Sequence, residues 1–144
     1  MSILRIFVAL LFLGETAADG TISEKILDGA KRQIGVIQWD RTMGAQHPAG
    51  KGVCTDVILD AFDYAGINLA DSMRNDIRKH RSAYPFAEGT AIDARRARVQ
   101  IDWFRRNAVT LSLEEDFQKG DVVFYTGTYR QDGSADHVAI VSDS

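Results

Sequence analysis

Residues 52–59 read Gly-Val-Cys-Thr-Asp-Val-Ile-Leu, and they hold the only cysteine of the chain. From Cys54 onward, apolar residues recur at the spacing of a helix face, and Gly66 supplies a stop signal. Cys54 is thus predicted in the first turn of a helix, where unpaired backbone N–H groups and the helix dipole favour a thiolate. Because the thiolate is the nucleophilic form, this stretch predicts a reactive cysteine on a buried, rigid helix.

The overall composition is that of a globular domain. The 144 residues are 45% hydrophobic and 26% charged, with a net charge of −3. This charge argues against a general nucleic-acid binder. A single cysteine excludes an internal disulfide and a cysteine-rich metal site.

The first 18 residues are predicted to be a signal peptide. Arg5 and the amino terminus are basic, residues 6–13 are uniformly apolar, and residues 16–18 are small enough for cleavage. The apolar run is short for a transmembrane helix, so no stable membrane span is expected after cleavage. The domain would comprise residues 19–144 and be periplasmic or extracellular. An uncleaved anchor or a buried N-terminal helix remains the alternative.

The rest of the chain changes from helical to extended patterns. Helices are predicted over residues 21–36, 54–65, 69–80 and 97–107, and strands over 109–111, 122–125 and 137–141. Asp132-Gly133 indicates a hairpin turn before the last strand. Helices followed by strands predict an α+β domain, with the helices packed on one face of an antiparallel sheet.

His137 opens the last predicted strand. An isolated histidine there is more often a satisfied core residue than a catalytic base. A cysteine at a helix start together with a strand histidine, however, supplies the two groups that thiol catalysis needs. The backbone N–H of Cys54 would then be one donor to the oxyanion.

Three segments in this order resemble the NlpC-type, papain-fold cysteine peptidases of bacterial cell walls: residues 52–57, 120–125 and 137–142. The nearer resemblance is to the exported domain-of-unknown-function family 1287, and it includes Tyr84-Pro85 and residues 92–96. The resemblance implies that Cys54 is the nucleophile and His137 the base. It also implies cleavage of amide bonds in peptidoglycan stem peptides, with no metal or organic cofactor.

The sequence departs from these families at two points. The family usually carries histidine where this chain has Ala94. The superfamily pattern also continues past the histidine strand with a polar residue that orients the imidazole, whereas this sequence ends at Ser144. We therefore expect a papain-like fold truncated after that strand: a fragment, a catalytic dyad or a degenerate domain. Asp136 should face away from His137, and Asp121 is more typical of a turn.

Five residues are predicted to bind substrate: Trp39, Asp40, Asp93, Arg95 and Arg96. Trp39 precedes the loop that leads to Cys54 and either lines a cleft or joins the core. The two arginines suit substrate carboxylates, although a solvated helix face is the simpler interpretation. Asp93 is alternatively a partner for a neighbouring arginine. The rival function is a catalytically inactive papain-like domain that binds cell-wall fragments or a protein partner; the oligomeric state is left open.

Overall fold

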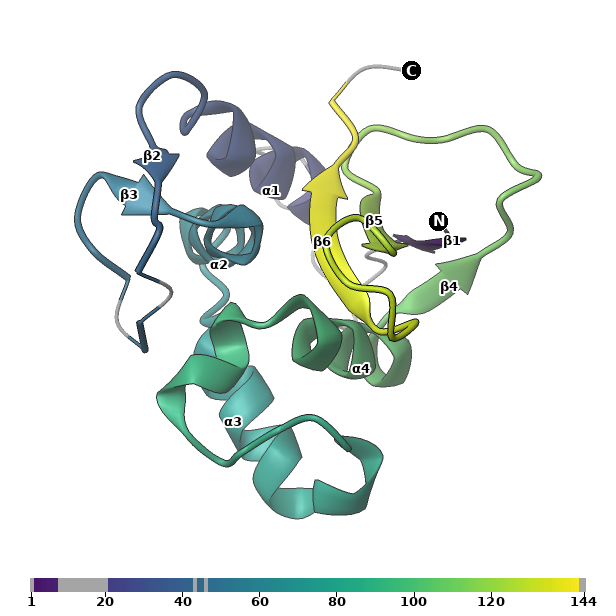
Figure 1. The fold of residues 1–144 in the computed structure, drawn as a ribbon. Helices are drawn as coiled ribbons and strands as arrows, with labels where there is room; N and C mark the ends of the chain where they lie inside the picture. The colour runs from purple at the N-terminus through teal and green to yellow at the C-terminus, as the bar shows by residue number, and fades with distance from the viewer. Residues whose placement is uncertain (1, 8–20, 43, 46, 143–144) are drawn as a thin grey trace.

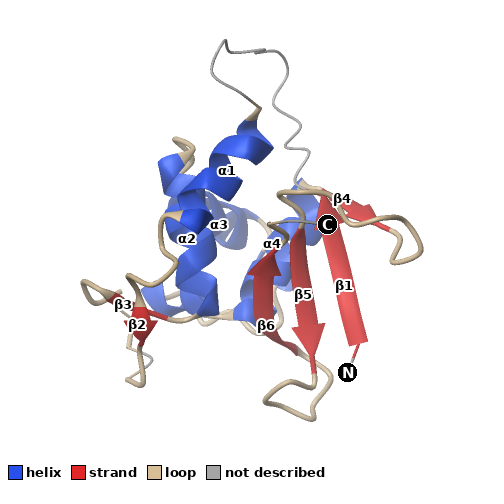
Figure 2. Ribbon diagram, turned by 90° about the horizontal axis from the view of Figure 1, so that it is seen from above, coloured by secondary structure: helices blue, strands red, loops and turns tan. Residues whose placement is uncertain are grey.

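The computed structural model describes residues 2–7, 21–42, 44–45 and 47–142, which form an α+β domain (Figure 1). A four-stranded antiparallel sheet has the order β4-β1-β5-β6, and the helices gather on one side of it (Figure 2). The helices are α1 (Ile22–Lys31), α2 (Cys54–Tyr64), α3 (Leu69–Lys79) and α4 (Ala97–Asn107), with 3₁₀ turns η1 (Arg81–Ala83) and η2 (Ala91–Arg95). The sheet strands are β1 (Ser2–Phe7), β4 (Val109–Leu111), β5 (Val122–Thr126) and β6 (Ala135–Ile140). This arrangement confirms the predicted α+β class.

Helix α1 begins as its sequence predicts and ends earlier. Thr21 and Glu24 form a capping box, in which the N–H of Glu24 donates to the Thr21 hydroxyl at 3.3 Å and the N–H of Thr21 to the Glu24 carboxylate at 2.6 Å. Helix was predicted to Val36, but after Lys31 the hydrogen bonds tighten to an i→i+3 pattern. Gly35 then adopts a left-handed conformation with φ of 76°. The chain consequently leaves the helix five residues early and turns toward Trp39.

The hairpin of β5 and β6 fixes where His137 lies. Val122 pairs with Ile140 and Tyr125 with His137, and the connecting loop spans residues 127–134. The turn predicted at Asp132-Gly133 lies in this loop, and Gly133 has the φ of 76° that glycine tolerates. Val138 is buried in the core, while His137 is half-buried.

The predicted signal peptide lies partly outside the described residues. Its first part, Ser2–Phe7, is strand β1, which pairs with both β4 and β5. A short apolar run suits a strand as well as the apolar region of a signal peptide, because periodicity alone does not separate the two. No helix within the described part of the chain is long and apolar enough to span a membrane.

Aromatic residues join the helices to the sheet. Phe104 of α4 contacts Phe62 of α2 and Phe124 of β5, with ring centroids 5.6 and 5.5 Å apart. All three rings are fully buried. Edge and tilted ring contacts of this kind add to the hydrophobic free energy of burial. Helix α2 also contacts β6, the strand that carries His137.

Candidate active site

Cys54 is the first residue of α2, as predicted. Val53 precedes it with an extended backbone, and the N–H of Val53 donates to the Asp56 carboxylate at 2.8 Å. Gly52 allows a close approach here, because a Cβ at this position would lie 3.1 Å from Cγ2 of Ile37 and 3.3 Å from Cβ of Asp56. Local sequence therefore accounts for both the helix start and the tight entry to it.

The sulfur of Cys54 contacts the histidine strand. It accepts the backbone N–H of Val138, the residue that follows His137. The thiol is otherwise largely enclosed, and this burial raises its pKa above the ordinary value; Asp56 adds to the rise, and the N–H groups of Val138 and Thr55 oppose it. We predicted a lowered pKa from the helix start. That prediction is wrong in direction, because the loss of hydration outweighs the nearby dipoles.

The imidazole of His137 is packed between two tyrosines. Its centroid lies 5.7 Å from that of Tyr125 and 6.1 Å from that of Tyr129. Burial lowers the pKa of His137, with Asp136 opposing the shift, so the neutral ring is favoured. Nδ1 is buried and makes no hydrogen bond to any described residue, Cys54 included. The ring is thus suited to accept a proton, but no side chain within the described residues orients it.

The two carboxylates considered as orienting groups serve other purposes. Asp136 accepts the N–H groups of Thr128, Tyr129 and Arg130, two of them at 2.6 Å, and so holds the loop after β5. Asp121 accepts the N–H of Gln118 at 2.8 Å. It also lies beside Val141, four positions along β6 from His137, which is about 13 Å at strand spacing. Both residues stabilise turns, a role that was predicted for Asp121 and not for Asp136.

Cys54 and His137 line the same cavity. This cavity, of about 430 Å³, is bordered by the end of α1, by Trp39 and by the start of α2. A second cavity of about 400 Å³ lies beside α4 and the loop after β5, and Trp39, Val53 and Cys54 line it as well. The sulfur therefore lies at the junction of two hollows. We call them the neutral lobe, which includes Ala30, Gln33, Ile34, Ile37, Val57 and His137, and the basic lobe, which includes Ile92, Arg95, Arg96, Arg98, Tyr129, Arg130 and Asp136.

Trp39 occupies a position suited to substrate contact. The short parallel pair of β2 (Gln38–Trp39) and β3 (Lys51–Gly52) brings it beside Cys54. Its side chain is 56% exposed and borders both lobes. Of the two interpretations that its sequence left open, the structure favours the cleft.

Asp40 and Arg95 belong to the framework under the site. The guanidinium of Arg95 donates to Asp56 at 2.7 and 2.8 Å and to Asp40 at 2.8 Å, and it also donates to the carbonyl of Gly44. All three charged side chains are at least 97% buried. Arg95 and Thr42 together hold the pKa of Asp40 well below its usual range, with the Thr42 hydroxyl the larger cause. Substrate contact was predicted for Asp40 and Arg95. For Asp40 this is corrected, because its oxygens accept from Thr42 and Arg95. Arg95 lines the second cavity, but its guanidinium is held by Asp40 and Asp56.

Asp93 and Arg96 are also engaged within the protein. Asp93 is buried and accepts the N–H groups of Glu88, Gly89 and Thr90. Arg96 pairs with Glu88 at 2.7 Å and lies 3.9 Å from Asp93. Asp93 therefore shapes a loop instead of reaching the cleft, which corrects its predicted role. Arg96 does line the basic lobe, with 23% of its side chain exposed.

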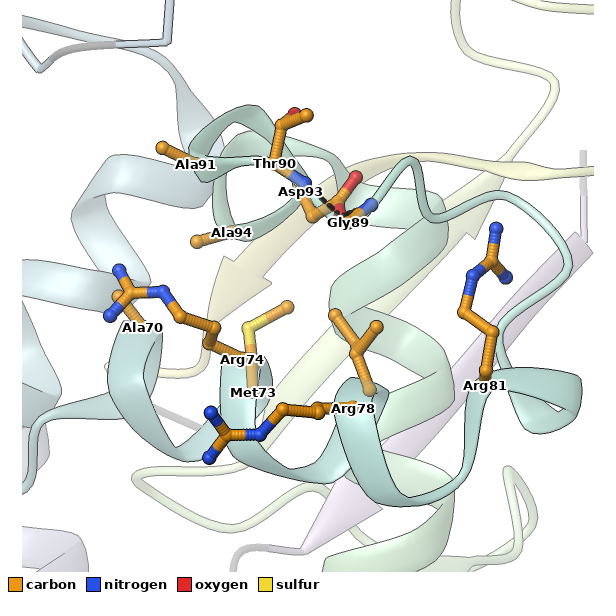
Figure 3. A pocket seen from close by; sticks show the side chains of 11 residues that line it. Ala70, Met73, Arg74, Arg78, Arg81, Gly89, Thr90, Ala91, Asp93 and Ala94 are labelled. Carbon is orange, nitrogen blue, oxygen red and sulfur yellow. Dashed lines mark hydrogen bonds between the residues drawn. The ribbon is translucent and has the colours of Figure 1, made fainter.

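A third cavity, of about 410 Å³, lies between α3 and η2, away from Cys54 (Figure 3). Met73 and Ala94 lie within it, and Arg74, Arg78 and Arg81 surround it (Figure 3). Its lining includes neither a thiol nor a histidine. Arg74 pairs with Asp71, and Arg81 donates to two backbone carbonyls. Ala94, where the family usually carries histidine, thus lies outside the Cys54 cleft.

Sequence reasoning missed Gln33, Arg98 and Arg130 as cleft residues. They come from the turn after α1, from α4 and from the loop before β6, and only the folded chain brings them to Cys54. Arg98 belongs to the arginine-rich stretch of residues 95–106, which suits substrate carboxylates, whereas Gln33 and Arg130 stand in no motif that would have marked them. Within the described residues, no three histidine, cysteine or acidic side chains gather as metal ligands would.

Residues 29–144 match the family model for the domain of unknown function DUF1287. The chain belongs to the DUF1287 family. A relative, the uncharacterized protein YijF of Escherichia coli strain K12, is 30% identical over 133 residues, which cover 82% of this chain and 63% of YijF. The chain thus spans less than two thirds of the length of that relative. No solved structure matches this DUF1287 chain significantly.

Proposed function

We propose that this DUF1287 chain is an exported cysteine amidohydrolase of the NlpC-type, papain-fold superfamily, periplasmic or extracellular, which cleaves amide bonds in peptidoglycan stem peptides. The observation that carries the proposal is the shared cavity of Cys54 and His137, together with the contact between the Cys54 sulfur and the N–H of Val138. A nucleophile and a base on separate elements, facing one hollow, are the minimum for acyl transfer through sulfur. The resemblance of residues 52–57, 120–125 and 137–142 to that superfamily supplies the substrate class.

The chemistry begins with a neutral pair. Because burial raises the pKa of Cys54 and lowers that of His137, the thiol and the imidazole are both uncharged at rest. The sulfur attacks the carbonyl carbon while its proton passes to the imidazole, so charge separates only during this step and yields an oxyanion and an imidazolium. The backbone N–H of Cys54, at the helix start, is a donor for the resulting oxyanion.

Collapse of this intermediate breaks the C–N bond. The imidazolium returns the proton to the leaving amine, and a thioester on Cys54 remains. A water molecule then attacks the thioester as His137 accepts its proton. The second collapse expels the sulfur, which regains a proton from the imidazolium, and releases the acid. Each step uses groups that this chain contributes and needs no cofactor.

The decisive experiment compares the full chain with Cys54→Ala and His137→Ala on purified peptidoglycan. We expect new amine and carboxylate ends from the unchanged protein and none from either variant, with thermal unfolding used to verify that the variants fold. A Tyr64→Phe variant, exposed at the far end of α2, is the matched control and should remain active. Cleavage by the Cys54→Ala variant would contradict the proposal.

An inactive binding domain is the second candidate. It is favoured by one observation: Nδ1 of His137 is buried with no hydrogen-bond partner among the described residues. An imidazole without an orienting group loses activity without losing the cleft. Binding of stem-peptide fragments by the unchanged protein, without cleavage of any of their amide bonds, would select this candidate over the hydrolase.

A further inference from the structure

The two lobes of the cleft differ in charge. Among the residues that the structure describes, the lining of the neutral lobe contains no aspartate, glutamate, lysine or arginine. The basic lobe is lined by four arginines and one carboxylate, that of Asp136. The Asp136 oxygens already accept three backbone N–H groups of the loop after β5. The sulfur of Cys54 therefore separates an uncharged hollow from a cationic one.

Two of the four arginines, Arg98 and Arg130, form no ion pair with a carboxylate within the described residues. Arg95 is neutralised by Asp40 and Asp56, and Arg96 is paired with Glu88. Within the described residues, no carboxylate lies at salt-bridge distance from Arg98 or Arg130. Asp132 interacts with both arginines through space, but its Oδ1 accepts the hydroxyl of Ser134 at 2.6 Å and the N–H of Ser134 at 3.0 Å.

These two arginines converge from different elements. Arg98 lies in the first turns of α4, with its guanidinium 5.0 Å from the centroid of the Phe86 ring, and Arg130 lies in the loop after β5. Both line the basic lobe beside Cys54. Guanidinium groups bind carboxylates bidentately and with geometric specificity. A carboxylate that enters this lobe therefore meets two cations without equivalent partners in the protein.

The neutral lobe offers apolar surface and one amide. Ile34 is 76% exposed and Trp39 is 56% exposed, so the lip of the lobe is an uncovered apolar surface. The side-chain amide of Gln33 donates to the carbonyl of Val57 at 3.1 Å, which fixes its orientation. Its Oε1 is buried without a partner among the described residues.

The chemistry of the step assigns a direction to the cleft. His137 protonates the leaving amine, and it lines the neutral lobe and not the basic one. The leaving residue must therefore occupy the neutral lobe, and the acyl residue the basic lobe on the other side of the sulfur.

We propose that this site selects substrates with a free carboxylate on the acyl residue, bound by Arg98 and Arg130, and an uncharged, apolar residue on the leaving side. The assignment of acyl and leaving sides rests on the proposed hydrolase function. The carboxylate assignment to the basic lobe rests on the charge distribution alone. Of the residues in a peptide, an acidic one on the acyl side and a small apolar one on the leaving side have this chemistry.

The test uses eight acetylated peptides that share one scissile amide. The acyl residue is glutamate or glutamine, in both configurations, and the leaving residue is alanine or lysine. We expect kcat/KM to be at least about tenfold higher for glutamate than for glutamine. A ratio of this size corresponds to the free energy of one hydrogen-bonded contact with a charged group. Alanine should likewise be preferred to lysine. The glutamate preference should be expressed in KM, because the carboxylate is bound before and during reaction.

Variants at the two arginines complete the test. Arg98→Gln and Arg130→Gln should each lose most of the preference for glutamate with kcat retained. Arg105→Gln is the matched control, since Arg105 is exposed on α4, pairs with Asp102 and lies outside both lobes. Equal kcat/KM for glutamate and glutamine, or the same loss in Arg105→Gln, would overturn the proposal.

A binding measurement separates this proposal from the hydrolase. Calorimetry of the full-length Cys54→Ala variant, titrated with the glutamate and glutamine peptides, does not need cleavage. We expect the Cys54→Ala variant to bind the glutamate peptide more tightly than the glutamine peptide, and to lose this difference when Arg98→Gln or Arg130→Gln is introduced as a second substitution. That result supports the carboxylate site even if the unchanged protein cleaves nothing. Equal binding of the two peptides overturns the carboxylate site even if the protein proves to be a hydrolase.

Discussion

At the scale of single residues, the cleft is governed by burial. Cys54 has the helix-start position that lowers a thiol pKa, yet it is enclosed by Val53, Trp39 and β6, and its pKa rises. Burial also lowers the pKa of His137. Both pKa shifts favour the uncharged forms of the two groups. We therefore expect the proton to move from Cys54 to His137 during the reaction and not in the resting protein.

The first prediction concerns the pH dependence of Cys54 alkylation. The rate with iodoacetamide should rise with an apparent pKa above the ordinary thiol value of about 8.5, because the buried thiolate is poorly solvated. Free cysteine, measured in the same buffers, is the control. An apparent pKa well below 8.5 would mean instead that an imidazolium stabilises the thiolate in the resting protein.

The second prediction concerns the pH profile of cleavage. His137 must be neutral to accept the proton, and burial lowers its pKa, so activity should persist below the usual histidine value of about 6.5. The acidic limb of kcat/KM should therefore lie below pH 6.5 and reflect the free enzyme. An acidic limb above this value would show that a nearby negative charge, and not burial, controls the ring.

At the scale of secondary-structure elements, buried charges and close helix contacts position the start of α2. Arg95, at the end of η2, bridges Asp56 in α2 and Asp40 after β2. Thr55 adds a hydrogen bond to the carbonyl of Arg95 at 2.9 Å. Three segments far apart in sequence are thus tied together one turn from Cys54.

The third prediction is that Arg95→Met destabilises the fold strongly. Its removal leaves two buried carboxylates without a cation, and breaking a buried ion pair costs about 3–5 kcal/mol. Chemical denaturation should detect this loss, while Arg105→Met, at an exposed i,i+3 pair on α4, should change stability by less than about 0.5 kcal/mol. An Arg95→Met protein as stable as the parent would show that the cluster contributes little to folding.

The fourth prediction concerns the contact of α1 with α2. A Cβ at Gly29 would lie 2.8 Å from Cβ of Tyr64 and 2.9 Å from the backbone of Ala61, so the helices would have to separate. Gly29→Ala should destabilise the protein, because overpacking costs about 1–3 kcal/mol and exceeds the helix-propensity gain of about 1 kcal/mol. Asp28→Ala, exposed on the same helix, should be near neutral. A stabilised Gly29→Ala variant would contradict the tight crossing.

At the scale of the whole molecule, the helices and the β5–β6 edge carry the cleft, and β1 lies on the far side of β5 from β6 (Figure 2). Both lobes are lined by residues between Ala30 and His137. The strand formed by Ser2–Phe7 pairs with β4 and β5 and lies away from the β6 edge. The cleft is therefore separable from the segment predicted to be a signal peptide.

The fifth prediction follows from that separation. A chain beginning at Asp19 should fold, with a lower thermal midpoint than the full chain, because β4 and β5 lose their shared partner. It should keep the Cys54 alkylation profile of the full chain. Circular dichroism and thermal unfolding test the first point, and iodoacetamide rates test the second. An unfolded Asp19 chain would show that Ser2–Phe7 is an integral strand and would count against its removal as a signal peptide.

Local patterns were enough to predict α2, α3, α4, β4 and the core of the β5–β6 hairpin, because spacing, caps and turn residues act between near neighbours in the chain. They were also enough to select Cys54 and His137. The early end of α1, the buried pairing of Asp40 with Arg95, the direction of the thiol pKa and the two-lobed cleft all followed from the folded chain instead. Burial and charge pairing depend on which distant segments exclude water from a group, and that is set by packing.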